Sequence, residues 1–260
     1  MSRGAKAAGA CLAWTVILLA LAWTVCGLAG NGERLAEDML RHAPPERTGL
    51  PAREYPGVGR MTAEYLTGET PVFQYTYTAG ESTYLCFREH EAAHMADCRA
   101  LIRLAGILGW AFGAAALALS GAGFLMKSRR RDFAGGMLAG LRAAGVIGAG
   151  LLIWGLVDFD GLFTAFHRIA FSNDGWLLDP RTELLIRLMP TSFFTEEALR
   201  VLAAMLAAAL AADLAARGIR GRIISGRSRN RHGLLGGFPP AGGGVERPGE
   251  GTDPGAGDQL

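Results

Sequence analysis

Histidine and carboxylate side chains gather in two short segments of this 260-residue chain, and the first segment is Glu89–Asp97. On a helix, residues three and four positions apart share a face, so His90, His94 and Asp97 would lie together, with Glu91 next to His94. An imidazole beside a carboxylate acts as a general acid or base near neutral pH, and it also binds metal ions.

The second segment contains His167, Arg168, Asn173 and Asp174, with Trp176 two residues further on. His167 supplies another imidazole, and its polar neighbours have the types that orient a ring or polarise a carbonyl group. Purely structural interpretations stay open for three of these residues. Asn173 and Asp174 suit a turn, and Trp176 suits an anchor at the headgroup level of a membrane.

A metal-dependent reaction is one hypothesis for the first segment. The five residues His90–His94 (HEAAH) match the zincin pattern, in which two histidines one turn apart bind zinc and the glutamate activates water. A catalytic zinc needs a third protein ligand, and His167 or Asp174 could supply it. The pattern therefore keeps a zinc-dependent membrane metalloprotease open as an alternative function.

Long apolar stretches must position both segments. Hydrophobic residues make up 50% of the chain and concentrate in blocks, and a helix needs about 20 apolar residues to cross a bilayer core. We predict a mainly α polytopic membrane protein with four transmembrane helices, the first of which is a retained anchor within residues 1–30. The other three predicted transmembrane segments are residues 104–126, 133–157 and 197–217.

The distribution of lysine and arginine predicts the orientation. These residues cluster before the first span, in the short loop 127–132 and after the fourth span, which is the pattern of cytoplasmic segments. We expect both termini on the cytoplasmic side of a bacterial cell membrane, with residues 31–103 and 158–196 on the extracytoplasmic side. Residues 218–260 cannot bury a core and are expected to form a disordered basic cytoplasmic tail. A formal net charge of +2 gives no reason to expect a nucleic-acid partner.

Residues 31–103 predict a small extracytoplasmic β-containing cap and a helix leading into the second span. Phe73, Tyr75 and Tyr77 alternate with polar residues, and a glycine-containing turn separates them from Tyr84–Phe87. This alternation predicts a β-hairpin. From Arg88 onward, the pattern is helical and continues into the apolar stretch.

Residues 158–196 predict short interfacial helices. Phe163, Phe166 and Ala170 recur at helical spacing, as in a helix that lies in the membrane interface. Asp179 followed by Pro180 has the form of an N-cap with a first-turn proline, so we expect a second helix to begin there. Both imidazole-bearing segments are thereby expected close to the outer bilayer surface.

Two stretches of the chain resemble a known family. They are Glu91–Asp97 (EAAHMAD) and Phe166–Trp176 (FHRIAFSNDGW), the second continuing through Leu178–Pro180 to Pro190 and Phe193–Phe194. Together with four spans and a long first outer loop, they resemble the bacterial integral membrane family of the lipoprotein intramolecular transacylases. His90 lies outside the family's pattern, and Cys98 stands where an aliphatic residue is more usual.

The resemblance implies an acyl migration on a lipoprotein whose N-terminal cysteine carries a thioether-linked diacylglyceryl group. The sn-2 acyl chain would move from the glycerol oxygen to the cysteine α-amine, giving a lyso-form N-acyl lipoprotein. The implied partners are this diacylglyceryl-modified lipoprotein and membrane lipids. No cofactor and no metal ligand are implied. The substrate brings its own nucleophile, so no serine or cysteine nucleophile is required.

Our hypothesis is that His167 is the general acid/base and that His94 is its partner or an oxyanion donor, with the two roles exchangeable. A carboxylate would orient an imidazole, and an amide or guanidinium would polarise the ester carbonyl. A non-enzymatic lipid-binding or assembly membrane protein remains a further alternative. The candidate catalytic residues are His167, His94, Asp97 and Asp174, and the candidate substrate-binding or oxyanion residues are Asn173, Arg168, Glu91 and Trp176.

Overall fold

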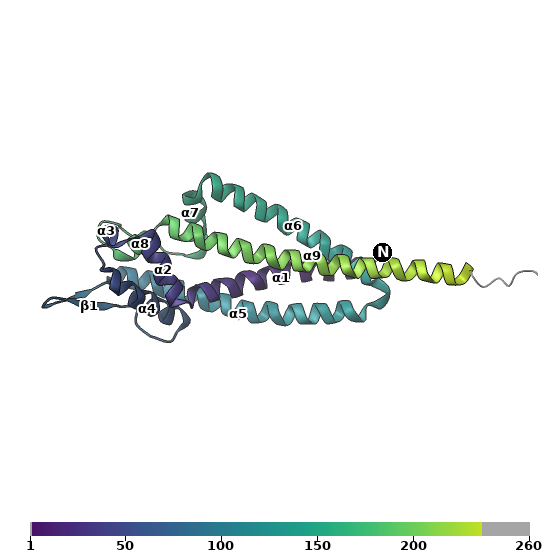
Figure 1. The fold of residues 1–260 in the computed structure, drawn as a ribbon, viewed down its shortest axis with the longest axis horizontal. Coiled ribbons are helices and arrows are strands. Elements are labelled where there is room, and N and C mark those ends of the chain that lie inside the picture. The colour runs from purple at the N-terminus through teal and green to yellow at the C-terminus, as the bar shows by residue number, and fades with distance from the viewer. Residues whose placement is uncertain (1, 236–260) are drawn as a thin grey trace, which may run out of the picture. The chain divides into compact units, whose positions relative to one another are not determined.

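Four long helices form the main body of the protein. The computed structural model describes residues 2–235, with side chains up to Arg220. The long helices are α1 (Arg3–Ala29), α5 (Glu89–Leu125), α6 (Arg130–Val157) and α9 (Thr191–Leu235) (Figure 1). Each contains a stretch long and apolar enough to cross a membrane, and many large apolar side chains on these helices are exposed. Lipid is the natural solvent for such surfaces. The predicted fold class is confirmed.

The α1 helix is the centre of this bundle and packs against both α5 and α6. A Cβ atom on Gly9 would collide with the carbonyl oxygen of Phe133, and one on Gly136 would collide with the carbonyl oxygen of Lys6. Because only glycine leaves this space free, the backbones of α1 and α6 approach closely at the crossing. Small residues serve the same purpose at many helix contacts in membranes.

A second, separate core lies at the end of the bundle where α1 ends and α5 begins. Figure 1 shows the short elements gathered there. Tyr55, Met39, Leu50, Val58 and Leu188 are almost fully buried in this core. The elements that form this cap are α2 (Gly32–His42), α3 (Pro45–Thr48), the 3-10 helix η1 (Ala52–Glu54), α4 (Tyr55–Thr67), β1 (Thr76–Ala79), β2 (Ser82–Leu85) and α8 (Leu184–Leu188).

The strands β1 and β2 form an antiparallel hairpin, as the alternation of aromatic and polar residues predicts. Tyr77 pairs with Tyr84, and their rings stack with centroids 5.2 Å apart. Gly80 in the connecting turn has a positive φ of 64°, which glycine adopts without strain. The hairpin leads through Cys86 and Phe87 directly into α5.

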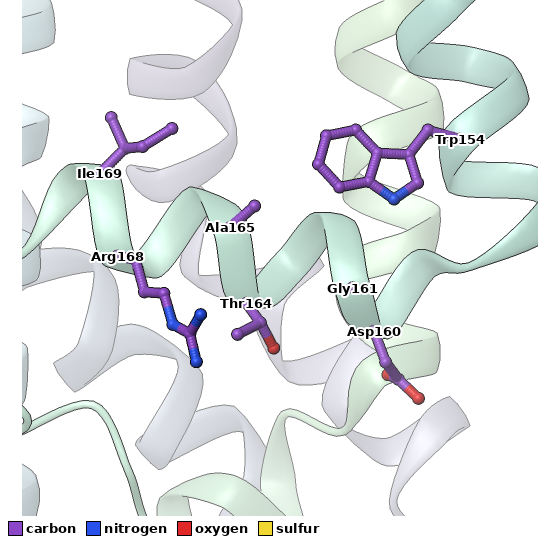
Figure 2. Close-up of a pocket in the computed structure, with 7 residues that line it drawn as sticks. All are labelled: Trp154, Asp160, Gly161, Thr164, Ala165, Arg168 and Ile169. Carbon is purple, nitrogen blue, oxygen red and sulfur yellow. The ribbon is translucent and has the colours of Figure 1, made fainter.

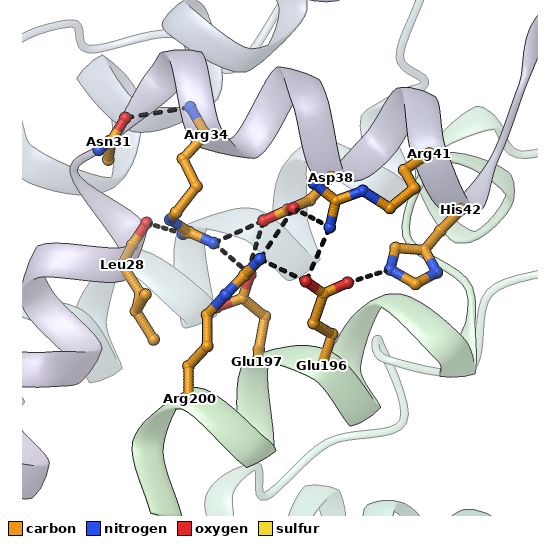
Figure 3. Close-up of polar contacts among 9 residues, drawn as sticks. All are labelled: Leu28, Asn31, Arg34, Asp38, Arg41, His42, Glu196, Glu197 and Arg200. Carbon is orange, nitrogen blue, oxygen red and sulfur yellow. Dashed lines mark hydrogen bonds and ion pairs between the residues drawn. The ribbon is translucent and has the colours of Figure 1, made fainter. Parts of the chain in front are cut away.

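An ionic network ties the cap to the start of α9 (Figure 3). Asp38 on α2 is 1% exposed and accepts hydrogen bonds from Arg34 at 2.8 Å and from Arg200 at 3.0 Å. His42 lies 2.6 Å from a carboxylate oxygen of Glu196. Because these charges come from two elements far apart in sequence, the network fixes where α9 begins relative to α2.

The segment between α6 and α9 departs from prediction at one point. The α7 helix (Phe159–Ala170) forms where helical spacing predicts it. The helix expected to begin at Asp179 does not begin there, since α8 starts only at Leu184. Asp179 instead accepts hydrogen bonds from the Arg181 backbone at 2.9 Å and from its guanidinium, which closes a turn over residues 180–182.

The last helix also extends beyond the predicted fourth span. Residues 218–235 were expected to be disordered, yet α9 continues to Leu235. This segment contains no proline, and arginine is a good helix former. Extending an existing helix costs less than nucleating a new one. The chain divides into two units, residues 1–221 and 222–260, and the rest of the expected tail, residues 236–260, lies outside the described residues.

Candidate active site

His94 on α5 and His167 on α7 lie side by side, with ring centroids 6.2 Å apart. Both side chains are buried, with 8% and 7% of the residue surface exposed. The 37-residue α5 helix is about 55 Å long at 1.5 Å per residue, far longer than a bilayer core. Since the stretch around His94 also carries charged residues, it is the end of α5 that leaves the apolar span. The two imidazoles therefore meet beside the cap.

The hydrogen bond of the His167 ring defines its tautomer. The His167 Nδ1–H group donates to the backbone carbonyl of Phe163, one turn earlier in α7, at 2.8 Å. A carbonyl oxygen only accepts, so in the neutral ring Nδ1 carries the proton and Nε2 carries the lone pair. Among the described residues Nε2 has no hydrogen-bond partner, so it is able to accept a proton from another molecule.

Aromatic side chains enclose His167. Its ring centroid lies 4.1 Å from that of Phe163, 5.0 Å from Trp176 and 5.5 Å from Phe171. Phe171 also contacts His94, at 5.2 Å between centroids. Burial lowers the pKa of His167, although its hydrogen bond to the Phe163 carbonyl opposes the shift. This imidazole is therefore neutral at pH 7 and ready to act as a base.

A turn after α7 holds Trp176 in place. The Asn173 side chain donates from Nδ2 to Asp97 Oδ2 at 2.9 Å, and its Oδ1 accepts from the Gly175 backbone at 2.8 Å. Side chains of this type commonly close their own turn in this way. Asp97 lies on the same helix as His94, so the contact joins the two histidine-bearing segments. The structure thus brings together His94, His167, Asp97, Asn173 and Trp176.

Glu91 is fully buried, and backbone groups occupy both of its carboxylate oxygens. One oxygen accepts from the Arg88 backbone at 2.7 Å, which caps α5, and the other accepts from the Leu185 backbone at 2.6 Å, at the start of α8. Buried carboxylates are stable only when hydrogen-bonded in this way. Glu91 therefore connects α5 to the segment before α9.

The zincin pattern lacks the geometry that its reaction needs. His90 turns to Glu183, at 2.7 Å from Nδ1, while His94 faces His167. Glu91 has no free oxygen with which to activate a water molecule. In the described part of the chain, no group of three or more histidine, cysteine or acidic side chains is arranged to hold a metal ion.

Two further candidates lie away from the histidine pair. The Asp174 side chain is exposed and forms no hydrogen bond within the described residues. Arg168 is also exposed, and it lines a pocket of about 660 Å³ between the end of α6 and one face of α7, together with Trp154 and Thr164 (Figure 2). This face of α7 is turned away from the side on which His167 meets Phe163.

The sequence did not indicate that Phe163 and Phe171 enclose the His167 ring. Phe163 contributed only to the helical spacing, and Phe171 only to the family resemblance. Both lie four positions from His167, so they sit one turn before and one turn after it. A histidine flanked by aromatics at this spacing on a helix is the signal that could have revealed an enclosed ring.

Solved structures show the same fold. The membrane integral lipoprotein intramolecular transacylase Lit from Bacillus cereus superposes with a TM-score of 0.66 at 17% identity, over 86% of this chain and 100% of that chain. Its variant with one histidine replaced by arginine gives a TM-score of 0.60 at 17% identity, over 85% and 94%. The variant with alanine at that histidine gives 0.60 at 17% identity, over 85% and 96%.

A family model provides evidence from sequence. None of the curated proteins matches the chain. The model of the lipoprotein intramolecular transacylase Lit, however, matches residues 11–194, which is more than half of the chain and includes both histidine-bearing segments. The chain therefore belongs to the Lit family of lipoprotein intramolecular transacylases.

Proposed function

We propose that this enzyme moves the sn-2 acyl chain of a diacylglyceryl-modified lipoprotein to the α-amine of the N-terminal cysteine, with His167 as the general base. The observation that carries this proposal is the free Nε2 lone pair of a buried, neutral imidazole beside a second imidazole. Family membership supports the reaction. The site geometry supports the assignment of roles.

The reaction needs a proton acceptor and a proton donor but no enzyme nucleophile. The amine nitrogen attacks the ester carbonyl carbon, a C–N bond forms, and the carbonyl oxygen becomes an oxyanion. His167 Nε2 takes the proton that the nitrogen loses. The C–O bond then breaks, and the imidazolium returns the proton to the glyceryl oxygen. The products are an N-acyl terminus and a lyso-glyceryl group on the same molecule.

Orientation provides much of the remaining catalysis. Ester and amine belong to one substrate, so binding them in reactive geometry makes the step unimolecular. A free α-amine has a pKa of about 8 and must be neutral to attack, which a positioned base assists. We assign His94 to stabilisation of the oxyanion. Asp97 and Asn173 would hold the turn that encloses the two rings.

The orientation in the membrane is part of the proposal. Arg3 and Lys6 lie in the first turns of α1. Lys127 and Arg129 lie between α5 and α6, and Arg130 and Arg131 begin α6. Both clusters are at the ends of the spans away from the cap, in keeping with a cytoplasmic location of the termini. The histidine pair would then lie at the extracytoplasmic surface, where it would meet the lipoprotein among membrane lipids.

Mass spectrometry of a lipoprotein's N-terminal peptide tests the proposal. Purified enzyme in lipid nanodiscs should convert a synthetic diacylglyceryl lipopeptide to its N-acyl lyso form. His167→Gln should reduce conversion about 10³-fold, because base catalysis and the proton return are both lost. His90→Gln is the matched control, since His90 lies one turn from His94 but pairs with Glu183. Full conversion by both His167→Gln and His94→Gln would refute the assignment.

The same assay separates the alternative functions. A zinc-dependent protease would lose activity with a chelator and would cleave a peptide bond in the substrate. The proposed reaction leaves the mass of the lipopeptide unchanged. It moves the acyl group from the glyceryl fragment to the fragment that contains the N-terminal amine. A non-enzymatic lipid-binding protein would yield no product at all.

A further inference from the structure

His94 has a polar neighbour on its own helix that the reaction scheme does not use. The Sγ atom of Cys98, one turn further along α5, lies 3.6 Å from His94 Nε2. Cys98 is partly buried against the apolar core of the cap. Within the described residues, this is the only hydrogen bond of the His94 ring. The thiol therefore occupies one ring nitrogen and leaves Nδ1 free.

The direction of this hydrogen bond follows from the chemistry of the two groups. A cysteine thiol has an ordinary pKa of about 8.5, so it carries its proton at pH 7. A thiol sulfur is a weak acceptor, whereas the lone pair of a neutral imidazole is a good one. The thiol therefore donates to Nε2. In the neutral ring, the single proton is then on Nδ1.

We propose that Cys98 is a positioning residue whose thiol holds His94 in the tautomer with the proton on Nδ1. This inference rests on the proposed acyl transfer and assigns different tasks to the two histidines. His167 has Nδ1 occupied and presents a lone pair at Nε2, as a base must. His94 has Nε2 occupied and presents an N–H group at Nδ1, as an oxyanion donor must.

His94 and His167 are complementary because one ring offers a proton donor and the other offers a proton acceptor, which two identical tautomers could not do. Two free lone pairs would repel the developing oxyanion, and two free N–H groups would leave no acceptor for the amine proton. Local hydrogen bonds to Phe163 and Cys98 set the two tautomers separately. The role of each ring is thus fixed before the substrate binds.

NMR of isotope-labelled imidazole nitrogens tests the tautomer directly. In purified protein at pH 7.5, with the His94 signals assigned by their absence in His94→Gln, we expect the proton on Nδ1. Cys98→Ala should move the His94 tautomer towards Nε2–H, whereas Cys98→Ser keeps a donor and should retain Nδ1–H. A wild-type His94 with its proton on Nε2 would overturn the inference. This readout does not depend on activity, so it stays decisive even if the acyl-transfer proposal fails.

Kinetics separates a hydrogen-bonding role from packing. Cys98→Ala and Cys98→Val should each lower kcat about tenfold with KM unchanged, because the oxyanion donor is no longer held in place. Cys98→Ser should restore kcat to within about twofold of wild type. Valine fills the apolar space without a donor, so normal activity of Cys98→Val would show that only packing matters and would overturn the inference. The control Ala96→Ser changes an exposed residue of the same helix and should leave kcat unchanged.

Discussion

Asn173 donates a hydrogen bond to Asp97 across 2.9 Å, and this bond joins the turn that carries Trp176 to the helix that carries His94. Neither residue contacts an imidazole through a hydrogen bond of its own. Their effect on the site is indirect, since the turn places the indole ring 5.0 Å from His167.

The first prediction separates the charge of Asp97 from its hydrogen bond. Asp97→Asn keeps an oxygen that can accept from Asn173, so kcat should fall less than about threefold. Asn173→Ala removes both the bond to Asp97 and the turn contact to Gly175, so kcat should fall about tenfold as Trp176 loses its position. Both values come from initial rates of lipopeptide conversion. Equal losses in the two variants would contradict a role through the hydrogen bond.

The second prediction concerns pH. Burial lowers the pKa of His167, so the base stays neutral to a lower pH than an ordinary histidine. Because the α-amine must be neutral to attack and only the neutral ring accepts a proton, kcat should fall in two steps as the pH decreases. The first step follows the amine pKa of about 8, and a second, steeper fall has a His167 midpoint below the ordinary histidine value of about 6.5. Trp176→Ala exposes the ring to water and favours its charged form, so the midpoint should move to higher pH. An unchanged midpoint in this variant would show that the indole does not desolvate His167.

The third prediction concerns the ionic network between α2 and α9. Asp38→Asn removes the buried carboxylate that Arg34 and Arg200 share, while Glu196 and Glu197 remain as partners of these arginines. The loss of the charged hydrogen bonds to Asp38 should cost roughly 1.5–3 kcal/mol of unfolding free energy. Thermal unfolding in detergent measures this loss. Glu37→Gln is the matched control, because Glu37 is the exposed neighbour on the same helix and should leave the unfolding temperature unchanged.

Asp38 also gives this network a pH dependence. Burial alone would raise its pKa, but the hydrogen bond and charge of Arg200, with Arg34 and Arg41, hold the pKa below its ordinary value. A carboxylate with a lowered pKa in the folded state contributes stability above its unfolded pKa of about 3.9, and this contribution is lost as the pH falls through the folded value. The Asn variant should therefore show a weaker loss of stability on acidification than wild type.

The fourth prediction concerns the crossing of α1 and α6. Gly136→Ala places a methyl group against the Lys6 carbonyl and should destabilise the protein by about 1–3 kcal/mol. The neighbouring Gly135 has open space at its Cβ position, so Gly135→Ala should be neutral or stabilising by up to about 1 kcal/mol. Thermal unfolding of the two variants compares them. A loss in Gly135→Ala as large as in Gly136→Ala would show that helix flexibility, rather than close approach, explains these glycines.

Patterns within single segments of the sequence predicted the features that depend on residues close together in the chain. Apolar stretches of sufficient length predicted the membrane spans, and alternation around Tyr77 and Tyr84 predicted the hairpin. Residue type and resemblance together singled out His94 and His167. The bonds that set their surroundings were out of reach, because they join positions far apart. Glu91 accepts from Leu185, and Asp97 accepts from Asn173. No spacing within one segment indicates such partners.

The unbroken course of α5 has a consequence for the membrane around the enzyme. The single α5 helix both contains an apolar stretch long enough to cross the hydrocarbon and carries His94 near its N-terminal end. The height of the imidazole above the lipid tails is therefore set by how deeply that helix sits, and bilayer thickness governs this depth. Ester groups lie at a level that also shifts with thickness. The depth of His94 and the depth of the substrate ester both depend on bilayer thickness, so lipids with longer or shorter chains would change the distance between them.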